Sequence, residues 1–498
     1  MAKWGIDLMR KRVKLSAFNF DVHPGIVLGF ALHWTWVWVM FWSQKFYSAS
    51  PALTSTLLLG LEPLWLLSIL SNVLCYGGLL LIGMRRGAIG RPAAAALVAA
   101  MLTTVGTVLI SVPAGATLAD AGGAGYVLGA LLTGVGSAIE VILWAELLTT
   151  LGARQVVVYS VLATLVGSVF FFVITLTPSA AARWITACLP IAEMWLFVRQ
   201  RALVPGNGAS ETPEAAQPTS ERRACVEIAV VSLFFGFSYG MMKGFFAGAA
   251  DDLIAIRDIL NVSALILGAA AILLTMSVLR MDFRHMTYQV ALPLMAAGFI
   301  LYSLGYPWDL IGFAAHQMGY QYFYIIIWAL WAVLSYDRQS PVTRFAALSM
   351  MAVMIGQLLG SIAGAQLMIA ATDPYAIAVI AACSVFVILL VALFGFESPF
   401  PGSDRNLFSF GASAEQRTPR FKLSIQQLAK TRGLSPRETE VFAYLAKGRN
   451  CSFISTQLVI SEETAKTHIK RIYRKFGVHS QQALLDLIEL DGHHKTEA

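Results

Sequence analysis

The residues best suited to a chemical task lie near the end of the chain, between Ser461 and Lys475. Ser461 can cap a helix, because its hydroxyl can accept from the free backbone N–H groups of a first turn. Glu462 and Glu463 follow, where the helix dipole favours negative charge. An apolar stripe continues at helical spacing, and these cations lie off it: Lys466, Lys470, Arg471, Arg474 and Lys475. A short helix with one apolar and one cationic face suits the major groove of DNA. The alternative is a solvated surface helix, which is what most charge runs are.

The segment before this helix narrows the choice. Ser435-Pro-Arg-Glu438 has the form of a capping box with proline at the first helical position. Gly448 can end that helix, Asn450 can cap a short second one, and a tight turn leads into the basic helix. A last helix is predicted at 481–490. The order is that of a helix-turn-helix unit within a four-helix domain.

Matching residues at the expected spacing cover about 60 positions: Leu434-Ser-Pro-Arg-Glu438, Glu440-Val441, Gly448, Ile454, Leu458, Ile460-Ser461, Thr464, Lys466, His468, Ile472, Lys475 and Gly477-Val478. Through them the C-terminus resembles the LuxR-type (GerE/NarL-like) DNA-binding domain. The resemblance implies that the third helix enters the major groove. Lys466, Thr467 and Lys470 would then face base edges. The residues expected near phosphates are Thr464, His468, Arg471, Arg474 and Lys475. The resemblance also implies a homodimer on double-stranded promoter DNA, paired through the last helix.

The rest of the chain has a different composition. Of 498 residues, 57% are hydrophobic and 13% are charged, and the mean hydropathy is +0.67. Soluble domains carry about a quarter charged residues. A lipid bilayer must therefore be part of the solvent of this chain. The five cysteines form no disulfide or zinc pattern.

Twelve apolar stretches are long enough to cross a bilayer. They are predicted at 25–44, 63–83, 93–113, 125–148, 155–176, 180–198, 226–247, 258–279, 287–305, 310–335, 343–369 and 376–396. A polar Pro/Gly/Ser-rich linker, 202–222, separates six helices (25–201) from six (223–396). This 6+6 layout resembles the major facilitator superfamily. The predicted fold is thus all-α, with a tether at 397–424 and the DNA-binding domain at 425–491.

The distribution of Lys and Arg predicts the orientation. The basic N-terminal segment 1–24 has no small-residue cleavage site after it and is expected to stay uncleaved. If it lies inside, most loop arginines also lie inside, as positively charged loops do. Both termini are then cytoplasmic in a multi-pass protein of the cell (inner) membrane. The loop 83–91 keeps the glycines and arginines of a transporter motif but lacks its aspartate, so the fold is favoured over transport activity.

Charged groups at bilayer depth need a partner or a purpose. By resemblance to the superfamily, helices one, four, seven and ten line a central cavity. A ligand pocket is predicted there from Glu140, Lys243, His316, Gln317 and Tyr320, with Trp36 and Tyr239 as walls. The alternative is structural: Glu140 and Lys243 form an interhelical ion pair, and the others form interhelical hydrogen bonds. Trp34, Trp38 and Trp42 are expected to face lipid or the interface.

These features predict a membrane-embedded transcriptional regulator whose membrane domain senses a small molecule and whose C-terminal domain binds promoter DNA. The main alternative is a major-facilitator-type transporter with a DNA-binding regulatory tail. A third possibility is a repressor held at the membrane without a ligand. The sequence contains no phosphate-binding loop, His-Glu-x-x-His or Gly-x-Ser-x-Gly motif. We therefore expect no enzyme, cofactor or metal.

Overall fold

The computed structural model describes residues 13–15, 20–43, 61–86, 89–111, 121–203, 218–245, 251–277, 286–338, 340–370, 428–429, 431–446, 451–458, 461–478 and 484. The chain divides into two compact units, Met1–Phe410 and Gly411–Ala498. The predicted tether and the predicted twelfth span lie outside the described residues.

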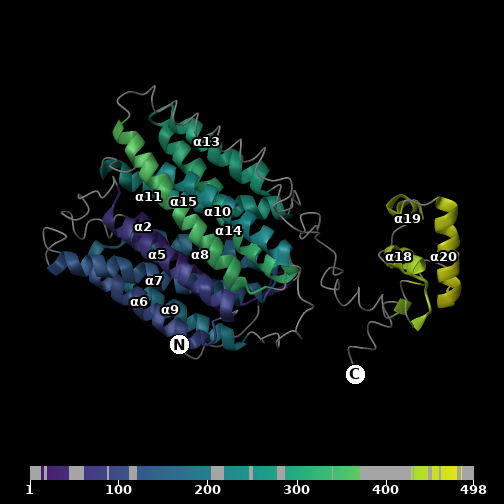
Figure 1. The fold of residues 1–498 in the computed structure, drawn as a ribbon. Coiled ribbons are helices and arrows are strands. Elements are labelled where there is room, and N and C mark those ends of the chain that lie inside the picture. The colour runs from purple at the N-terminus through teal and green to yellow at the C-terminus, as the bar shows by residue number, and fades with distance from the viewer. Residues whose placement is uncertain are drawn as a thin grey trace. The chain divides into compact units, whose positions relative to one another are not determined.

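The first half of the membrane unit begins with a short antiparallel hairpin of β1 (Val13–Leu15) and β2 (Phe20–Val22). Six long helices follow (purple to blue in Figure 1): α2 (Pro24–Trp42), α5 (Pro63–Arg86), α6 (Pro92–Ser111), α7 (Ala121–Thr149), α8 (Ala153–Leu176) and α9 (Ser179–Leu203). Three of these helices start at a proline. Its fixed φ and missing N–H suit a first helical turn.

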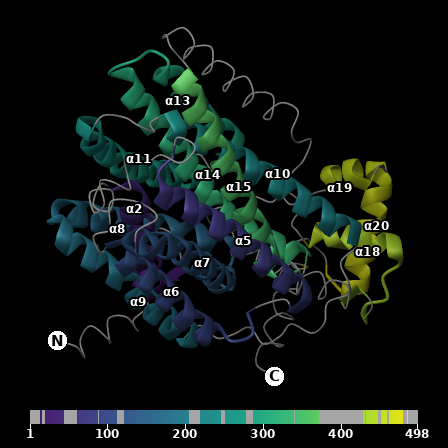
Figure 2. The same cartoon turned by 60° about the vertical axis from the view of Figure 1, so that its left-hand side comes forward.

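The second half follows in teal and green in Figures 1 and 2: α10 (Pro218–Phe245), α11 (Asp251–Ser277), the π-helix η1 (Met286–Ala291), α13 (Leu292–Tyr302), α14 (Trp308–Arg338) and α15 (Val342–Ala370). Helix α10 begins at Pro218, inside the segment predicted as linker 202–222. The remainder of that linker, 204–217, lies outside the described residues.

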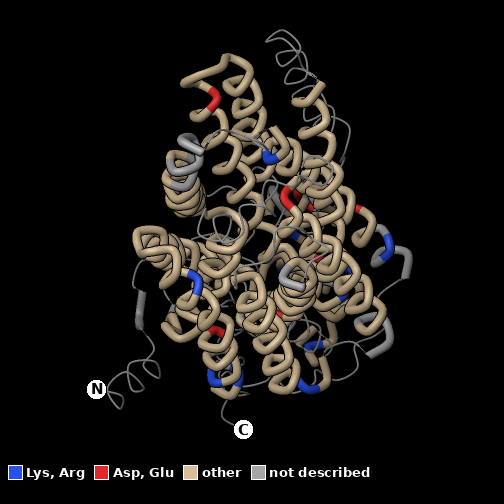
Figure 3. The backbone as a smooth tube through the Cα atoms, turned by 90° about the vertical axis from the view of Figure 1, so that its left-hand side faces the viewer, with Lys and Arg blue, Asp and Glu red and all other residues tan. Residues whose placement is uncertain are grey.

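Among the described residues, ten helices are long and apolar enough to cross a membrane. The ninth predicted span, 287–305, is shorter than expected, because α13 has only 11 residues and follows a π-helical turn. Large apolar side chains are exposed on the outer surface of the bundle. Leu74 is 78% exposed and Leu176 is 71% exposed. Figure 3 shows few charged positions along the long helices. A surface of this kind needs lipid around it.

The two halves meet along corresponding helices. The second helix of the chain, α5, packs on α15, and the fifth, α8, packs on α11 and α14. Helix α7 also reaches α14 and α15. Since α5–α15 and α8–α11 pair helices two with eleven and five with eight, the contacts of the two halves repeat with approximate two-fold symmetry.

Helices α10 and α15 approach most closely through glycines spaced four residues apart. A Cβ added at any of them would overlap backbone of the facing helix; they are Gly236, Gly240 and Gly244 of α10 and Gly356, Gly360 and Gly364 of α15. Small residues at this spacing let transmembrane backbones come close enough for dense van der Waals contact. The pattern is visible in the sequence, but only the structure shows that the two rows face each other.

The C-terminal unit contains α18 (Pro436–Leu445), α19 (Cys451–Leu458) and α20 (Glu462–Phe476). Its core joins all three helices through Phe442, Ile454 and Ile472. The rings of Phe442 and Phe476 stack with centroids 4.7 Å apart. The predicted last helix, 481–490, is described only at Leu484, which is buried in this core.

Candidate functional site

The basic helix α20 begins and ends as its sequence predicts. The Ser461 hydroxyl accepts from the backbone N–H of Thr464 at 3.1 Å. Gly477 ends the helix in the left-handed conformation, with φ 69°. Ala465, Ile472 and Phe476 are buried against the rest of the unit. One face of α20 is therefore fixed to the domain, which leaves the opposite face available.

The opposite face carries the residues predicted to contact DNA. Six of them are exposed: Thr464, Lys466, Thr467, Lys470, Arg471 and Arg474. His468 and Lys475 are half-buried. Lys466 forms an ion pair with Glu463 at 2.8 Å, and both side chains are well exposed. This pair contributes little stability because water screens it, so Lys466 can exchange its partner for a DNA base or phosphate.

Lys475 has a structural role that its position in the cationic run did not indicate. Its ammonium donates to Glu438 Oε2 at 2.7 Å and to the Gly433 carbonyl at 2.7 Å. Glu438 Oε2 also accepts from the backbone N–H of Ser435, completing the predicted capping box of α18. The Lys475 ammonium, together with the Ser435 N–H, lowers the pKa of the Glu438 carboxyl to about 2. The end of α20 is thereby attached to the start of α18.

Arg437 and Cys451 add two further links between the helices. The Arg437 guanidinium donates to the carbonyl of Leu458 at 2.8 Å, joining α18 to the end of α19. The Cys451 thiol lies 3.6 Å from the carbonyl of Glu462 and connects α19 to α20. These contacts hold the three helices in one arrangement and present the exposed face of α20 as a rigid surface.

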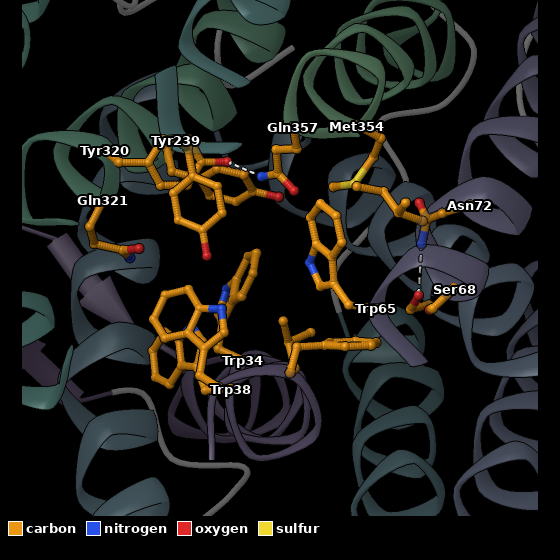
Figure 4. Close-up of a pocket in the computed structure, with 16 residues that line it drawn as sticks. Trp34, Trp38, Trp65, Ser68, Asn72, Tyr239, Tyr320, Gln321, Met354 and Gln357 are labelled. Atoms are coloured by element: carbon orange, nitrogen blue, oxygen red, sulfur yellow. Dashed lines mark hydrogen bonds between the residues drawn. The ribbon is translucent and has the colours of Figure 1, made fainter. Parts of the chain in front are cut away.

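In the membrane unit, a pocket lies between the two halves (Figure 4). It contains about 780 Å³ of space not filled by atoms, its open mouth included. Helices α2, α5 and α7 of the first half and α10, α14 and α15 of the second half supply its walls.

Aromatic rings make up much of the pocket wall. Trp34, Trp38 and Trp42 form a row along α2, each ring 6.1 Å from the next. The row continues to Tyr239 of α10, whose ring lies 4.2 Å from that of Tyr320 on α14. Figure 4 shows Trp65 on another side of the same space. A ligand in the pocket would lie among ring faces and edges.

The prediction for the tryptophans of α2 was wrong. Trp34 is 9% and Trp38 1% exposed, and both line the pocket instead of facing lipid. Trp36, predicted as a cavity wall, instead donates from its indole N–H to Thr107 of α6 at 3.0 Å. Because α2 is apolar and largely buried on all sides, its sequence does not distinguish the cavity side from the side that packs on α6.

A few polar groups interrupt the aromatic wall. The Gln357 amide donates to the Tyr320 hydroxyl at 2.7 Å, as the dashed line in Figure 4 shows. Asn72 donates to Ser137 at 3.0 Å, and Gln321 donates to Thr164 of α8 at 3.3 Å. Each of these side chains retains further hydrogen-bonding capacity. They are the groups able to orient a ligand.

The five residues predicted to bind a ligand are not gathered in this pocket. Tyr320 lines it. Lys243 lies next to it, with its ammonium 5.1 Å from the ring centre of Trp65. His316 is fully buried, with Nε2 3.2 Å from the Ser238 hydroxyl. Gln317 is buried outside the pocket lining. Glu140 is fully buried. Its charged neighbours are His33 and Glu193, and not Lys243 as the structural alternative predicted.

Glu146, near the end of α7, is a second buried glutamate of this helix. It is 7% exposed. Its Oε1 accepts from the backbone N–H of Ile89 at 3.0 Å and from the Thr343 hydroxyl at 2.7 Å. Ile89 belongs to the loop before α6, and Thr343 to the first turn of α15. Glu146 therefore connects the two halves at one end of the bundle.

Comparisons with known proteins match the C-terminal unit and the membrane unit to two different groups of proteins. Residues 432–488 match the family described as bacterial regulatory proteins, luxR family. The spore germination protein GerE of Bacillus subtilis (strain 168) is 36% identical over 58 residues, which are 11% of this chain and 78% of that protein.

The membrane unit is similar in fold to solved transporters. One is a bacterial homologue of the iron transporter ferroportin in an outward-facing state, with a TM-score of 0.53, 12% identity, and coverage of 74% of this chain and 96% of that one. Another is FucP, a major facilitator superfamily transporter in the outward conformation, with a TM-score of 0.51, 13% identity, and coverage of 75% and 97%. At these identities the likeness concerns the fold alone.

Proposed function

The chain belongs to the luxR family of bacterial regulatory proteins through its C-terminal unit, and we propose that it is a transcriptional regulator that senses a small molecule inside the membrane. The observation that carries this proposal is the combination of two sites in one chain. The exposed cationic face of α20 suits DNA, and an aromatic pocket lies between the two halves of the membrane unit.

The position of the pocket suggests how a ligand would act. Because its walls come from both halves, a bound molecule contacts both at once. It would therefore favour the arrangement in which the halves fit it best. A ligand shifts such an equilibrium only by the difference in its affinity for the two states. We propose that the halves move relative to each other and that this movement changes the availability of α20 for promoter DNA.

The wall also limits the ligand class. Tryptophan and tyrosine rings offer stacking faces and edges, while Gln357, Gln321 and Asn72 offer amide groups. Among the described residues, no carboxylate lines the pocket. A small planar molecule with an aromatic ring and one or two polar substituents fits this chemistry.

The proposal places the chain in the inner membrane with both termini in the cytoplasm, where the DNA is. A reporter fused after residue 400 tests this directly. A fused reporter enzyme that works only in the cytoplasm should be active, and a fused reporter enzyme that works only in the periplasm should be inactive. Activity in the periplasm would contradict the orientation.

Ligand binding can be tested on the full chain in lipid nanodiscs with a panel of small aromatic compounds. We expect at least one compound to raise the melting temperature of the wild type. Trp38→Phe should weaken that effect, because it removes indole surface from the wall. Trp36→Phe is the matched control, since Trp36 is a buried indole of the same helix that contacts Thr107 instead. Equal effects of the two variants would contradict the pocket assignment.

DNA binding needs a separate test. We expect the purified full chain to select a two-fold symmetric operator from random sequence, with both half-sites protected, if two copies bind together. The genes flanking the chain's own gene are the first promoters to examine. Selection of no sequence, with the unit folded, would contradict promoter recognition.

The alternative function is a transporter with a DNA-binding tail. The transporter-like fold and the pocket between two halves favour it. Accumulation of a pocket ligand in proteoliposomes, lost in Trp38→Phe and retained in Trp36→Phe, would support transport. A ligand that stabilises the protein and alters promoter activity without being accumulated supports a sensor.

A further inference from the structure

Three ionisable side chains meet in the interior of the first half, away from the pocket lining. They are His33 of α2, Glu140 of α7 and Glu193 of α9, and each is 0% exposed. Three separate helices thus bring one imidazole and two carboxyl groups together where none is exposed to bulk solvent. Such groups are rare at bilayer depth because burying their charge is costly.

The distances within this triad suit a bound ion. His33 Nδ1 lies 3.4 Å from Glu140 Oε2 and 3.1 Å from Glu193 Oε1. One ligand atom from each residue lies within 4.8 Å of the other two. Ligands bonded at about 2.1 Å to one tetrahedral or octahedral ion are roughly 3.0–3.4 Å apart. Both measured separations lie in this range.

Hydrogen bonds orient the carboxylates and still leave ligand atoms free. The Thr103 hydroxyl donates to Glu140 Oε1 at 2.8 Å, and the Trp144 indole N–H donates to Glu193 Oε1 at 2.8 Å. His33 Nδ1 contacts both carboxylates, whereas His33 Nε2 and Glu193 Oε2 have no hydrogen-bond partner among the described residues. Buried polar atoms without partners call for an explanation, and outer-shell donors of this kind commonly orient metal ligands.

Charge gives an independent argument. Two ionised carboxylates require two positive charges in this buried interior, of which a protonated His33 supplies only one, and an uncompensated buried charge is strongly destabilising. Within the described residues, neither glutamate pairs with a lysine or arginine. A divalent cation supplies both charges and leaves the imidazole neutral, which is the state that binds metals.

We propose that His33, Glu140 and Glu193 form a binding site for one divalent transition-metal cation. An imidazole nitrogen with two carboxylate oxygens suits Zn²⁺, Fe²⁺ or Mn²⁺ better than Mg²⁺ or Ca²⁺, which prefer oxygen ligands alone. The ion joins α2, α7 and α9 of the first half. Binding of this ion requires neither the DNA-binding unit nor the ligand proposed for the pocket.

The site also adjoins the pocket through one residue. The ring of Trp34 meets that of His33 edge to face, with centroids 5.1 Å apart, and Trp34 lines the pocket. An ion that fixes the His33 ring therefore also restricts this part of the pocket wall.

The test uses the full chain in lipid nanodiscs, loaded with Zn²⁺ or Mn²⁺ and then exchanged into metal-free buffer. We expect one ion per wild-type chain by elemental analysis and a higher melting temperature with the ion than without it. Glu140→Gln and Glu193→Gln should each lose the ion. Glu146→Gln should retain it, because Glu146 is a buried glutamate of the same helix whose contacts are Ile89 and Thr343. Trp144→Phe, which removes a donor to Glu193, should weaken affinity about 10- to 100-fold.

X-ray absorption at the metal edge identifies the ligands of the ion in the wild type. This measurement tests the site even if a variant fails to fold. The expected spectrum contains one imidazole and an otherwise oxygen coordination shell. Folded wild-type chain that retains no ion would overturn the proposal. Retention of the ion by both glutamine variants, or a spectrum without imidazole, would overturn it as well.

Discussion

Helices α20 and α2 both carry the side chains on which function depends, but they distribute them differently. On α20, buried residues such as Ala465 and Ile472 lie on one face and exposed cations lie on the other. On α2, Trp34, Trp36 and Trp38 are all buried although they point in different directions. Water surrounds the free face of α20, so polarity marks its orientation. No side of α2 needs to be polar, so composition does not mark one.

The comparison extends to charge. Helix α20 keeps Lys466, Lys470, Arg471 and Arg474 at the surface, where they can meet a polyanion. The membrane unit instead buries Glu140, Glu146 and Glu193. Each of those carboxylates accepts a hydrogen bond from another helix or loop. Exposed charge is therefore available to a partner outside the chain, whereas buried charge needs contacts within the chain or a bound ion.

The sharpest test of the exposed face is the double substitution Lys466→Ala and Lys470→Ala. We expect loss of operator discrimination, with about 2–6 kcal/mol of specific binding free energy removed if both contact base edges. Fluorescence anisotropy with operator and scrambled DNA measures this. Arg432→Gln is the control, since it removes a cation of the same unit outside α20. Retained discrimination in the double variant would show that this face does not recognise bases.

In the membrane unit, the corresponding test concerns the buried glycine contact between α10 and α15. Gly240→Leu should destabilise the membrane unit by about 1–3 kcal/mol or more, because the new side chain overlaps the backbone at Gln357. Thermal unfolding in nanodiscs measures the change. Gly78→Leu is the matched control, since a Cβ at Gly78 meets nothing within 4 Å. If the two variants are equally stable, the close approach of α10 and α15 is incorrect.

Glu438 tests how a buried charge stabilises the C-terminal unit. Its pKa is lowered to about 2 by the Lys475 ammonium and the Ser435 N–H, from a usual value of 4.5. A lowered folded-state pKa means that its stabilisation is complete above about pH 4.5 and is lost as the pH falls toward 2. Glu438→Gln should cost on the order of 2 kcal/mol near neutral pH. In the wild type, amide hydrogen exchange in α20 should become faster as the pH falls toward 2. This pH dependence should be weaker in Glu438→Gln, and an unchanged pH dependence would contradict a stabilising contact between Glu438 and Lys475.

The smallest effect is expected at the start of α20. Ser461→Ala removes the acceptor for the Thr464 N–H and should cost about 1 kcal/mol. Faster exchange confined to the first turn of α20 would show it. Ser461→Asp should restore slow exchange, because a carboxylate also caps the helix. Identical exchange in all three proteins would mean that the cap contributes nothing.

The predictions that agree with the structure are those that depend on residues close together in the sequence. The capping box at Ser435, the cap at Ser461 and the end at Gly477 depend on neighbouring residues, and the structure has all three. The run of apolar stretches likewise predicted the long helices from α2 to α15, apart from the shortened ninth span. Lys475 shows the limit, because its partner Glu438 is 37 residues away and comes close only on folding.

By itself the sequence determined that this chain combines a membrane domain with a LuxR-type DNA-binding domain, because apolar length and helix periodicity are local properties. It also determined which face of α20 is exposed. The tertiary structure alone decided that Trp34 and Trp38 line a pocket, that Trp36 packs on α6, and that His33, Glu140 and Glu193 meet. In a helix surrounded by apolar material, rotation about its own axis is set by its neighbours, and those neighbours are known only once the chain is folded.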